Sequence, residues 1–266
     1  DLLAKVEEKY KTELENHLNE LIRLDNIEYD DYANTNSSSI INMGKLTIIN
    51  SKITGNASSN GNTLINSIGD IVLKNTEIVA NSLVGYAANI WAGTVTVEDC
   101  NLDTERGGLA ILGGNVTINN TNIDTAVGGV NWRPLYIVDG RPNYDVNVTV
   151  NGGNFMGYRD CVYIGHADYA NMKVTFNGGT YGLNEGPKNT KLFIVEKKVA
   201  NPTHSFDVTV KGGTFNFKDL GNLEEYIAKG YRRNAEGKIV KENAISTKAE
   251  MVSAIAEGGK FELDTD

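Results

Sequence analysis

The chain has 266 residues, a formal net charge of −9 and 22% charged residues. This acidic balance argues against a nucleic-acid partner, because phosphate backbones are bound by clustered Lys and Arg. The mean hydropathy is −0.30, and no apolar stretch approaches the ~18 residues of a membrane span. Three histidines and two cysteines, none at ligand spacing, predict no metal site, and we expect no cofactor.

Residues 1–24 contain no Gly or Pro, and their apolar residues recur with a helical period, at Leu3, Val6, Tyr10, Leu14, Leu18 and Leu21. The sequence therefore predicts an N-terminal α-helix. Such a helix either caps the structure that follows or joins copies of the chain as a coiled coil, and we favour self-association. Residues 25–38 are polar and acidic and are predicted to form a linker.

A repeated motif occupies residues 39–217. Seven alternating triplets have centres 25, 24, 21, 32, 26 and 34 residues apart. They are Leu46-Thr47-Ile48, Ile71-Val72-Leu73, Val95-Thr96-Val97, Val116-Thr117-Ile118, Val148-Thr149-Val150, Val174-Thr175-Phe176 and Val208-Thr209-Val210. A second short apolar strand precedes each triplet, from Ile40-Ile41 in the first copy to Leu192-Phe193-Ile194-Val195 in the last.

Three aligned columns follow each triplet. The first holds residues that tolerate a left-handed turn, namely Asn50, Asn75, Asp99, Asn120, Gly152, Gly178 and Gly212. The second holds small residues, namely Ser51, Thr76, Cys100, Thr121, Gly153, Gly179 and Gly213. The third holds large apolar or aromatic residues, namely Ile53, Ile78, Leu102, Ile123, Phe155, Tyr181 and Phe215.

These columns indicate strands that are interrupted by identical corners. One copy cannot bury its apolar residues alone, whereas copies stacked at about 4.8 Å pair like strand with like. The predicted fold is all-β, a right-handed parallel β-helix of about seven coils, in which the small column, Cys100 included, serves packing. An antiparallel sandwich is the alternative, but its hairpins would not repeat the same turn chemistry in register.

The repeat ends after Phe217. Residues 218–266 are predicted to form a transition region with short helices, one of them starting at the capping box Thr247-Lys248-Ala249-Glu250. A strand begins at Lys260-Phe261-Glu262-Leu263, from which we expect a further β-structured domain outside this chain.

Several segments carry a family resemblance. The coils read "GGNVTINNTNID" at 113–124 and "GGTFNF" at 212–217, and the ending reads "YIAKGY" at 226–231 with "GKIV" at 237–240. The stacked motif resembles pectate-lyase-like β-helices, and its combination with a helical N-terminus resembles bacteriophage tail-spike and fibre proteins. The resemblance covers about 34–266 and implies a homotrimer that binds a host-surface glycan.

Aromatic, acidic and arginine residues concentrate in the last three coils. If the second strands are aligned on Ile137, Ile164 and Ile194, one column holds Asp139, His166 and Glu196, and another holds Arg133, Asp160 and Thr190. The nearby insertions add Trp132, Arg141, Tyr144, Asp145, Tyr158, Arg159, Asp168 and Tyr169.

Three interpretations of this region are open. In the first, Trp132, Tyr144, Tyr158 and Tyr169 stack on sugar rings while Arg133, Asp139, Arg141, Asp160 and His166 bond hydroxyls. In the second, Asp139 and Glu196, two coils and roughly 9–10 Å apart, hydrolyse a glycan, with His166 nearby. In the third, the face is solvated and Arg133 and Asp160 merely form a ladder pair.

The sequence favours a structural module of a phage particle, a tail or head fibre or spike that attaches to the host surface by glycan binding. It predicts a homotrimer on the virion that contacts other virion proteins through the N-terminal helix, with no membrane or nucleic acid as partner. A bacterial surface adhesin and a glycan depolymerase are the alternatives, and the sequence leans against an enzyme.

Overall fold

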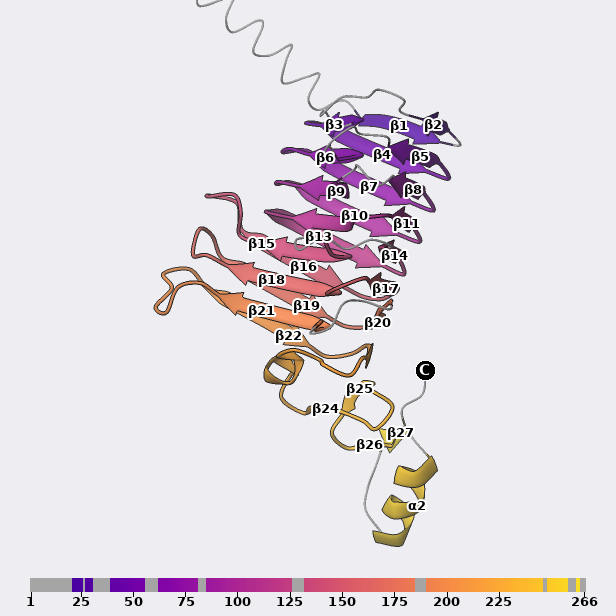
Figure 1. Cartoon of the computed structure of the whole chain (residues 1–266), viewed down its shortest axis with the longest axis vertical. Helices are drawn as coiled ribbons and strands as arrows, with labels where there is room; N and C mark the ends of the chain where they lie inside the picture. The colour runs from indigo at the N-terminus through magenta and orange to yellow at the C-terminus, as the bar shows by residue number, and fades with distance from the viewer. Residues whose placement is uncertain are drawn as a thin grey trace, which may run out of the picture.

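The computed structural model describes residues 21–25, 27–30, 39–55, 62–80, 85–125, 132–184, 190–245, 248–257 and 262–263. Most of these residues form an elongated stack of parallel strands, arranged as three sheets along one axis (Figure 1). The chain passes through sheets A, B and C in turn, so each strand pairs with the strand three elements later. The molecule is an all-β parallel solenoid.

The three sheets have these members. Sheet A contains β1 (Leu21–Asp25), β4 (Lys45–Ile49), β7 (Asp70–Lys74), β10 (Thr94–Glu98), β13 (Gly114–Asn119), β16 (Val146–Val150), β19 (Met172–Phe176) and β22 (Phe206–Val210). Sheet B contains β2 (Glu28–Asp30), β5 (Lys52–Gly55), β8 (Glu77–Ala80), β11 (Asn101–Thr104), β14 (Asn122–Thr125), β17 (Asn154–Gly157), β20 (Thr180–Leu183) and β23 (Thr214–Asn216). Sheet C contains β3 (Ile40–Asn42), β6 (Leu64–Asn66), β9 (Tyr86–Ile90), β12 (Gly107–Ile111), β15 (Leu135–Val138), β18 (Val162–His166) and β21 (Phe193–Lys197).

The predicted triplets are the centres of seven strands of sheet A. Their middle residues pair in one unbroken column from Thr47 through Thr209, so the alignment by sequence is confirmed residue by residue. The residues on either side of each middle residue point inward and are buried. An alternating apolar pattern with one face in the core therefore specified these strands.

The core consists of like residues stacked on like. All seven members of the large apolar column are fully buried, and its aromatic members continue one another along the axis. The rings of Phe155 and Tyr181 lie 5.0 Å apart, and those of Tyr181 and Phe215 lie 4.5 Å apart, with both pairs 8° from parallel. Offset stacking of this kind adds to the free energy gained by burial.

The corner between sheets A and B shows the turn chemistry that the sequence predicted. Asn50, Asn75, Asp99 and Asn120 all have positive φ, between 43° and 52°. In the later coils the left-handed residue is the second glycine, at Gly153, Gly179 and Gly213, one position later than predicted. A Cβ at Gly153 would lie 2.0 Å from the carbonyl oxygen of Thr121, so the close approach of adjacent coils requires glycine there.

The four non-glycine side chains of the small column are buried and also hydrogen-bonded. The hydroxyls of Ser51, Thr76 and Thr121 donate to the carbonyl oxygen two residues earlier, at 2.7, 2.9 and 3.0 Å. The Cys100 thiol takes the same position, with its sulfur 3.2 Å from the Glu98 oxygen. Each side chain thereby satisfies a carbonyl at the turn.

The N-terminal boundary differs from the prediction. Residues 1–20, where the helix was expected, lie outside the described residues, and Leu21–Asp25, predicted as the helix end, is strand β1. Glu28–Asp30, predicted as linker, is strand β2. The apolar residues at 21, 22 and 24 fit the period of a helix or of a strand. They form a strand because β1 pairs in parallel with the edge of β4, and Leu24 packs against the core.

The segment after Phe217 covers the last coil. Gly221 bridges to Phe193 of sheet C, Ile227 to Val210 of sheet A, and Lys238 to Thr214 of sheet B, so all three sheet edges acquire backbone partners. The predicted helical stretch here is only the 3-10 turn η1 (Leu223–Tyr226), which precedes the hairpin β24 (Tyr231–Arg233) and β25 (Ile239–Lys241). Pairing of this kind removes open edges that invite aggregation.

The C-terminal helix is confirmed as α2 (Lys248–Glu257). The strand predicted after it is β27 (Glu262–Leu263), which pairs in parallel with β26 (Ala244–Ile245). Figure 1 places this small unit beyond the covered end of the solenoid.

The core columns predict an asymmetric response on one strand. Ile78 is fully buried in β8, whereas its neighbour Val79 points outward. We expect Ile78→Ala to lower the free energy of unfolding by about 2–5 kcal/mol, because it leaves a cavity between coils. Val79→Ala is the matched control and should change it by less than about 0.5 kcal/mol. Urea titration followed by circular dichroism measures both, and equal effects would contradict the assigned alternation.

Candidate functional site

The predicted site residues fall at opposite ends of the sheet C strands. Trp132, Arg133 and Asp160 lie before β15 and β18, whereas Asp139 and Arg141 follow β15. Six residues of extended chain separate Arg133 from Asp139, or about 20 Å. The nine residues therefore do not form one site.

At the entry to sheet C, Arg133 and Asp160 form a buried ion pair. Both Nε and Nη2 of Arg133 lie 3.1 Å from Oδ2 of Asp160, as the ladder alignment predicted. The Arg133 guanidinium also lies 4.4 Å from the ring centre of Tyr163, which stacks on Tyr136 at 5.4 Å. These rings face one another and the arginine, so their faces are not open to a sugar.

Two further aromatic residues, Tyr86 and Trp132, extend this ladder. Trp132 meets the ring of Tyr86 edge-on at 5.1 Å, and the Arg106 guanidinium lies 5.5 Å from the Trp132 ring centre. Tyr158 is half-buried in the turn after β17. Burial, together with the hydrogen bond to Glu196, raises the pKa of Tyr163 above its ordinary value, which keeps its hydroxyl a donor. The entry side is therefore a structural ladder.

The predicted alignment of Asp139, His166 and Glu196 is wrong by one residue at Glu196. The register pairs Ile164 with Val195, so Glu196 lies beside Gly165, and Lys197 lies beside His166. The alignment failed because Leu192-Phe193-Ile194-Val195 is a continuous apolar run in which alternation does not fix the register. For the same reason Thr190 does not align with Asp160.

Asp139 and His166 are buried and hold backbone together. The two Asp139 oxygens accept the amide protons of Ala167 and Tyr169 at 2.7 and 2.8 Å, and His166 Nε2 lies 3.6 Å from Oδ2 of Asp139. The imidazole also packs against the Phe206 ring at 4.9 Å. Asp139 is 1% exposed and His166 0% exposed, so neither group faces a substrate.

The same arrangement recurs in the loops between sheets C and A. Asp145 accepts the amide of Asn171 at 3.1 Å, and Asp168 accepts the amides of Thr203 and His204 at 2.9 and 2.7 Å. Each acid thus binds the loop of the next coil. These clamps fix loops that strand pairing does not reach.

Beside the clamped loops lies a group of four side chains, which we name the loop corner: half-buried Trp91 and Arg141, and exposed Tyr144 and Tyr169. The Arg141 guanidinium lies 3.9 Å from the Trp91 ring centre. Tyr144 and Tyr169 are 45% and 56% exposed, and the register of β16 and β19 places them on neighbouring coils. Within the described residues the Arg141 side chain has no hydrogen-bond or ion-pair partner, and its buried Nε is unsatisfied.

Glycine allows the Arg141 loop to approach Trp91. A Cβ at Gly113 would lie 2.4 Å from the Trp91 carbonyl oxygen and 2.9 Å from Cβ of Tyr144. The 139–145 insertion therefore folds back over an earlier coil. Sequence reasoning assigned binding roles to Arg141, Tyr144 and Tyr169 but not to Trp91, although its position directly after inward-facing Ile90 was an available signal that it points outward.

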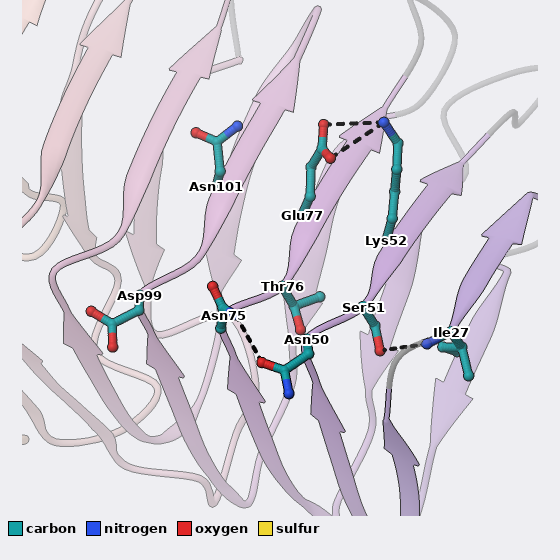
Figure 2. Close-up of a pocket in the computed structure, with 9 residues that line it drawn as sticks. All are labelled: Ile27, Asn50, Ser51, Lys52, Asn75, Thr76, Glu77, Asp99 and Asn101. Atoms are coloured by element: carbon teal, nitrogen blue, oxygen red, sulfur yellow. Dashed lines mark hydrogen bonds and ion pairs between the residues drawn. The ribbon is translucent and has the colours of Figure 1, made fainter.

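A depression follows the corner between sheets A and B in the first coils (Figure 2). Its volume is about 540 Å³, and polar groups dominate its lining. The lining residues are Ile27, Asn50, Ser51, Lys52, Asn75, Thr76, Glu77, Asp99 and Asn101. Asn75 donates to Asn50 at 2.7 Å, and Lys52 pairs with Glu77, so much of this polarity is satisfied internally.

The described part of the chain lacks a candidate metal site, a membrane-spanning helix and a reactive thiol. It holds no group of three or more His, Cys, Asp or Glu residues that could bind a metal ion, and no helix long and apolar enough to cross a membrane. Cys100 and Cys161 are free and buried. Burial raises the pKa of the Cys100 thiol to about 11 and that of Cys161 further, so both remain protonated at neutral pH.

Comparisons with known proteins give no relative for this chain. No family model, no curated protein and no solved structure matches it.

The Asp168 clamp predicts a pH dependence. Hydrogen bonds from Thr203 and His204 hold the pKa of the Asp168 carboxyl well below its ordinary value. The clamp is therefore complete above the ordinary carboxyl range and is lost only as the pH falls through the lowered pKa. At neutral pH, Asp168→Asn should raise the exchange rates of the Thr203 and His204 amides several-fold, measured by NMR. Unchanged rates would contradict the clamp, and the Val146 amide, bonded to a backbone oxygen, serves as control.

Proposed function

We propose that this chain is a rod module of a bacteriophage fibre or spike, on tail or head, that attaches to the host surface by binding a glycan. The parallel solenoid supports this proposal because it extends loops a fixed distance along a stiff axis. The loops after β15, β18 and β21 project furthest from that axis in Figure 1. In this proposal residues 1–20 join the rod to other virion proteins, and three copies form the fibre.

The loop corner is the observation that carries the glycan-binding proposal. It combines two exposed tyrosine rings with a guanidinium that packs on Trp91 and has no hydrogen-bond or ion-pair partner among the described residues. Aromatic faces pack on the apolar faces of pyranoses, and a guanidinium offers several donors to hydroxyl or carboxylate oxygens. Because the Asp139, Asp145 and Asp168 clamps hold the loops, a ligand meets them already ordered, which lowers the entropic cost of binding.

The proposed activity is binding without cleavage. Two carboxyl groups must face one glycosidic bond for hydrolysis. Asp139 is buried and engaged by two amides, His166 is buried, and Glu196 accepts from Tyr163 in a different column. None of the three catalytic candidates shares an open space with another, which favours a binding module over a depolymerase.

Substitutions at the loop corner test the proposal. We expect Arg141→Ala or Trp91→Ala to weaken binding to host-surface polysaccharide by at least about tenfold, because each removes a central contact of a small site. Thr149→Ala, on the outward face of sheet A, is the matched control and should bind as the wild type does. Binding is measured by surface plasmon resonance on immobilised polysaccharide, with circular dichroism to verify folding.

Two results would contradict the proposal. One is that the wild-type chain binds no polysaccharide from any host that its particle infects. The other is that binding persists unchanged in the double variant Arg141→Ala/Trp91→Ala.

A further inference from the structure

The first two coils expose a group of large apolar side chains. Ile41, Met43 and Ile68 are 59%, 50% and 48% exposed, and Ile65 pairs with Ile41 in the adjoining strand. We name these four residues the apolar corner. Ile41 and Ile65 lie on the outward face of β3 and β6, and Met43 and Ile68 lie at the bends toward β4 and β7. Contiguous exposed apolar groups on a folded chain mark an interaction surface.

The outward faces of the three sheets differ in charge. Sheet A carries charged residues beside its threonine column, namely Lys45, Asp70, Lys74, Glu98, Lys173, Asp207 and Lys211. Sheet B carries Lys52, Glu77, Asp103 and Asp124. The outward positions of sheet C are uncharged until Glu196 in its last strand; they include Ile41, Ile65, Asn89, Ala110, Tyr136, Tyr163 and Ile194.

The chain covers this uncharged face itself from the third coil onward. Arg141 lies over Trp91, Ala110 is only 1% exposed, and Tyr136 and Tyr163 stack together under Arg133. Within the described residues, the first two coils receive no such cover. The exposed corner is therefore the uncovered remainder of one uncharged face.

We propose that a second copy of this chain packs on the apolar corner. A chain with a net charge of −9 repels its copies, so identical faces meet at least cost where neither carries a charge. Sheet C of the first coils is that face. The corner also adjoins the coil that begins at β1, directly after residues 1–20, the segment whose sequence predicts self-association.

That three copies assemble rests on the proposed function as a fibre. That the apolar corner is their contact surface does not. Copies joined through residues 1–20 would meet first at the first coils, and the apolar corner would then align them side by side. The loop corner projects from later strands, so assembly and glycan binding are separable by substitution.

Light scattering of the full chain tests the proposal. We expect the wild-type chain to have a mass of at least twice the 28.9 kDa of one copy. The double variant Ile41→Lys/Met43→Lys should dissociate into single copies at a concentration at least about tenfold higher than the wild type does. The substitution buries charge only at the interface, since both side chains point outward from the core. Thr47→Lys/Thr96→Lys, on the outward face of sheet A, is the matched control and should leave the mass unchanged.

Methionine oxidation provides a second measurement within one chain. Met43 and Met251 are similarly exposed in a single copy, at 50% and 42%. If a second copy covers the corner, peroxide should oxidise Met43 at least about tenfold more slowly than Met251, and the lysine variant Ile41→Lys should abolish the difference. Peptide mass spectrometry gives both rates.

Three results would overturn the proposal. A wild-type mass of 28.9 kDa at all concentrations would do so, even with Met43 protected, since residues 1–20 of the same chain would then be the cover. An unchanged mass in the double lysine variant would assign assembly elsewhere. Equal oxidation of Met43 and Met251 in an oligomer would leave the corner uncovered. Polysaccharide binding by the lysine variant tests the proposed glycan-binding function independently of assembly.

Discussion

The structure depends on the stacking of like residues in register between adjacent coils. Each strand of sheets A and B has neighbours only in the coils before and after it, so a slip of one residue would turn its apolar side chains outward. The inward columns prevent the slip because aliphatic residues meet aliphatic residues and rings meet rings, as in Phe155, Tyr181 and Phe215. Strands with an unpaired edge therefore occur only at the two ends of the stack. At the C-terminal end, residues within 219–241 pair with the last strand of each sheet.

Polar residues at the ends of the strands are also stacked on like or complementary residues of the adjacent coil. Asn42 donates to Asn66 at 2.7 Å in the core, and Asn119, Asn151 and Asn177 form a hydrogen-bonded ladder at the corner. In the loops of the later coils, where backbone pairing ends, the carboxylates of Asp139, Asp145 and Asp168 bond the amides of the next coil. These asparagines and aspartates therefore hold successive coils together, whereas the Arg141 side chain has no hydrogen-bond or ion-pair partner among the described residues.

Sequence reasoning recovered the repeated elements and missed several features that occur once. The strands of sheets A and C and the corner turns follow from aligned columns, because identical chemistry in seven copies identifies each position. The strand β1 was missed because its apolar residues also fit a helix, and Glu196 was misplaced because a continuous apolar run does not fix register. The contact between Trp91 and Arg141 was not foreseeable, since it depends on how the 139–145 insertion folds back over an earlier coil.

The register itself is the central claim, because both the loop corner and the apolar corner are assigned from it. Its most direct test is cross-linking between outward threonines of sheet A. Thr149 and Thr175 are paired in adjacent coils, at a strand spacing of about 4.8 Å that suits a disulfide, whereas Thr149 and Thr209 lie two coils apart. Under mild oxidation, the account predicts an intrachain disulfide in Thr149→Cys/Thr175→Cys and none in Thr149→Cys/Thr209→Cys. Failure of the first pair to link, or linkage of both at equal rates, would contradict the stacked solenoid.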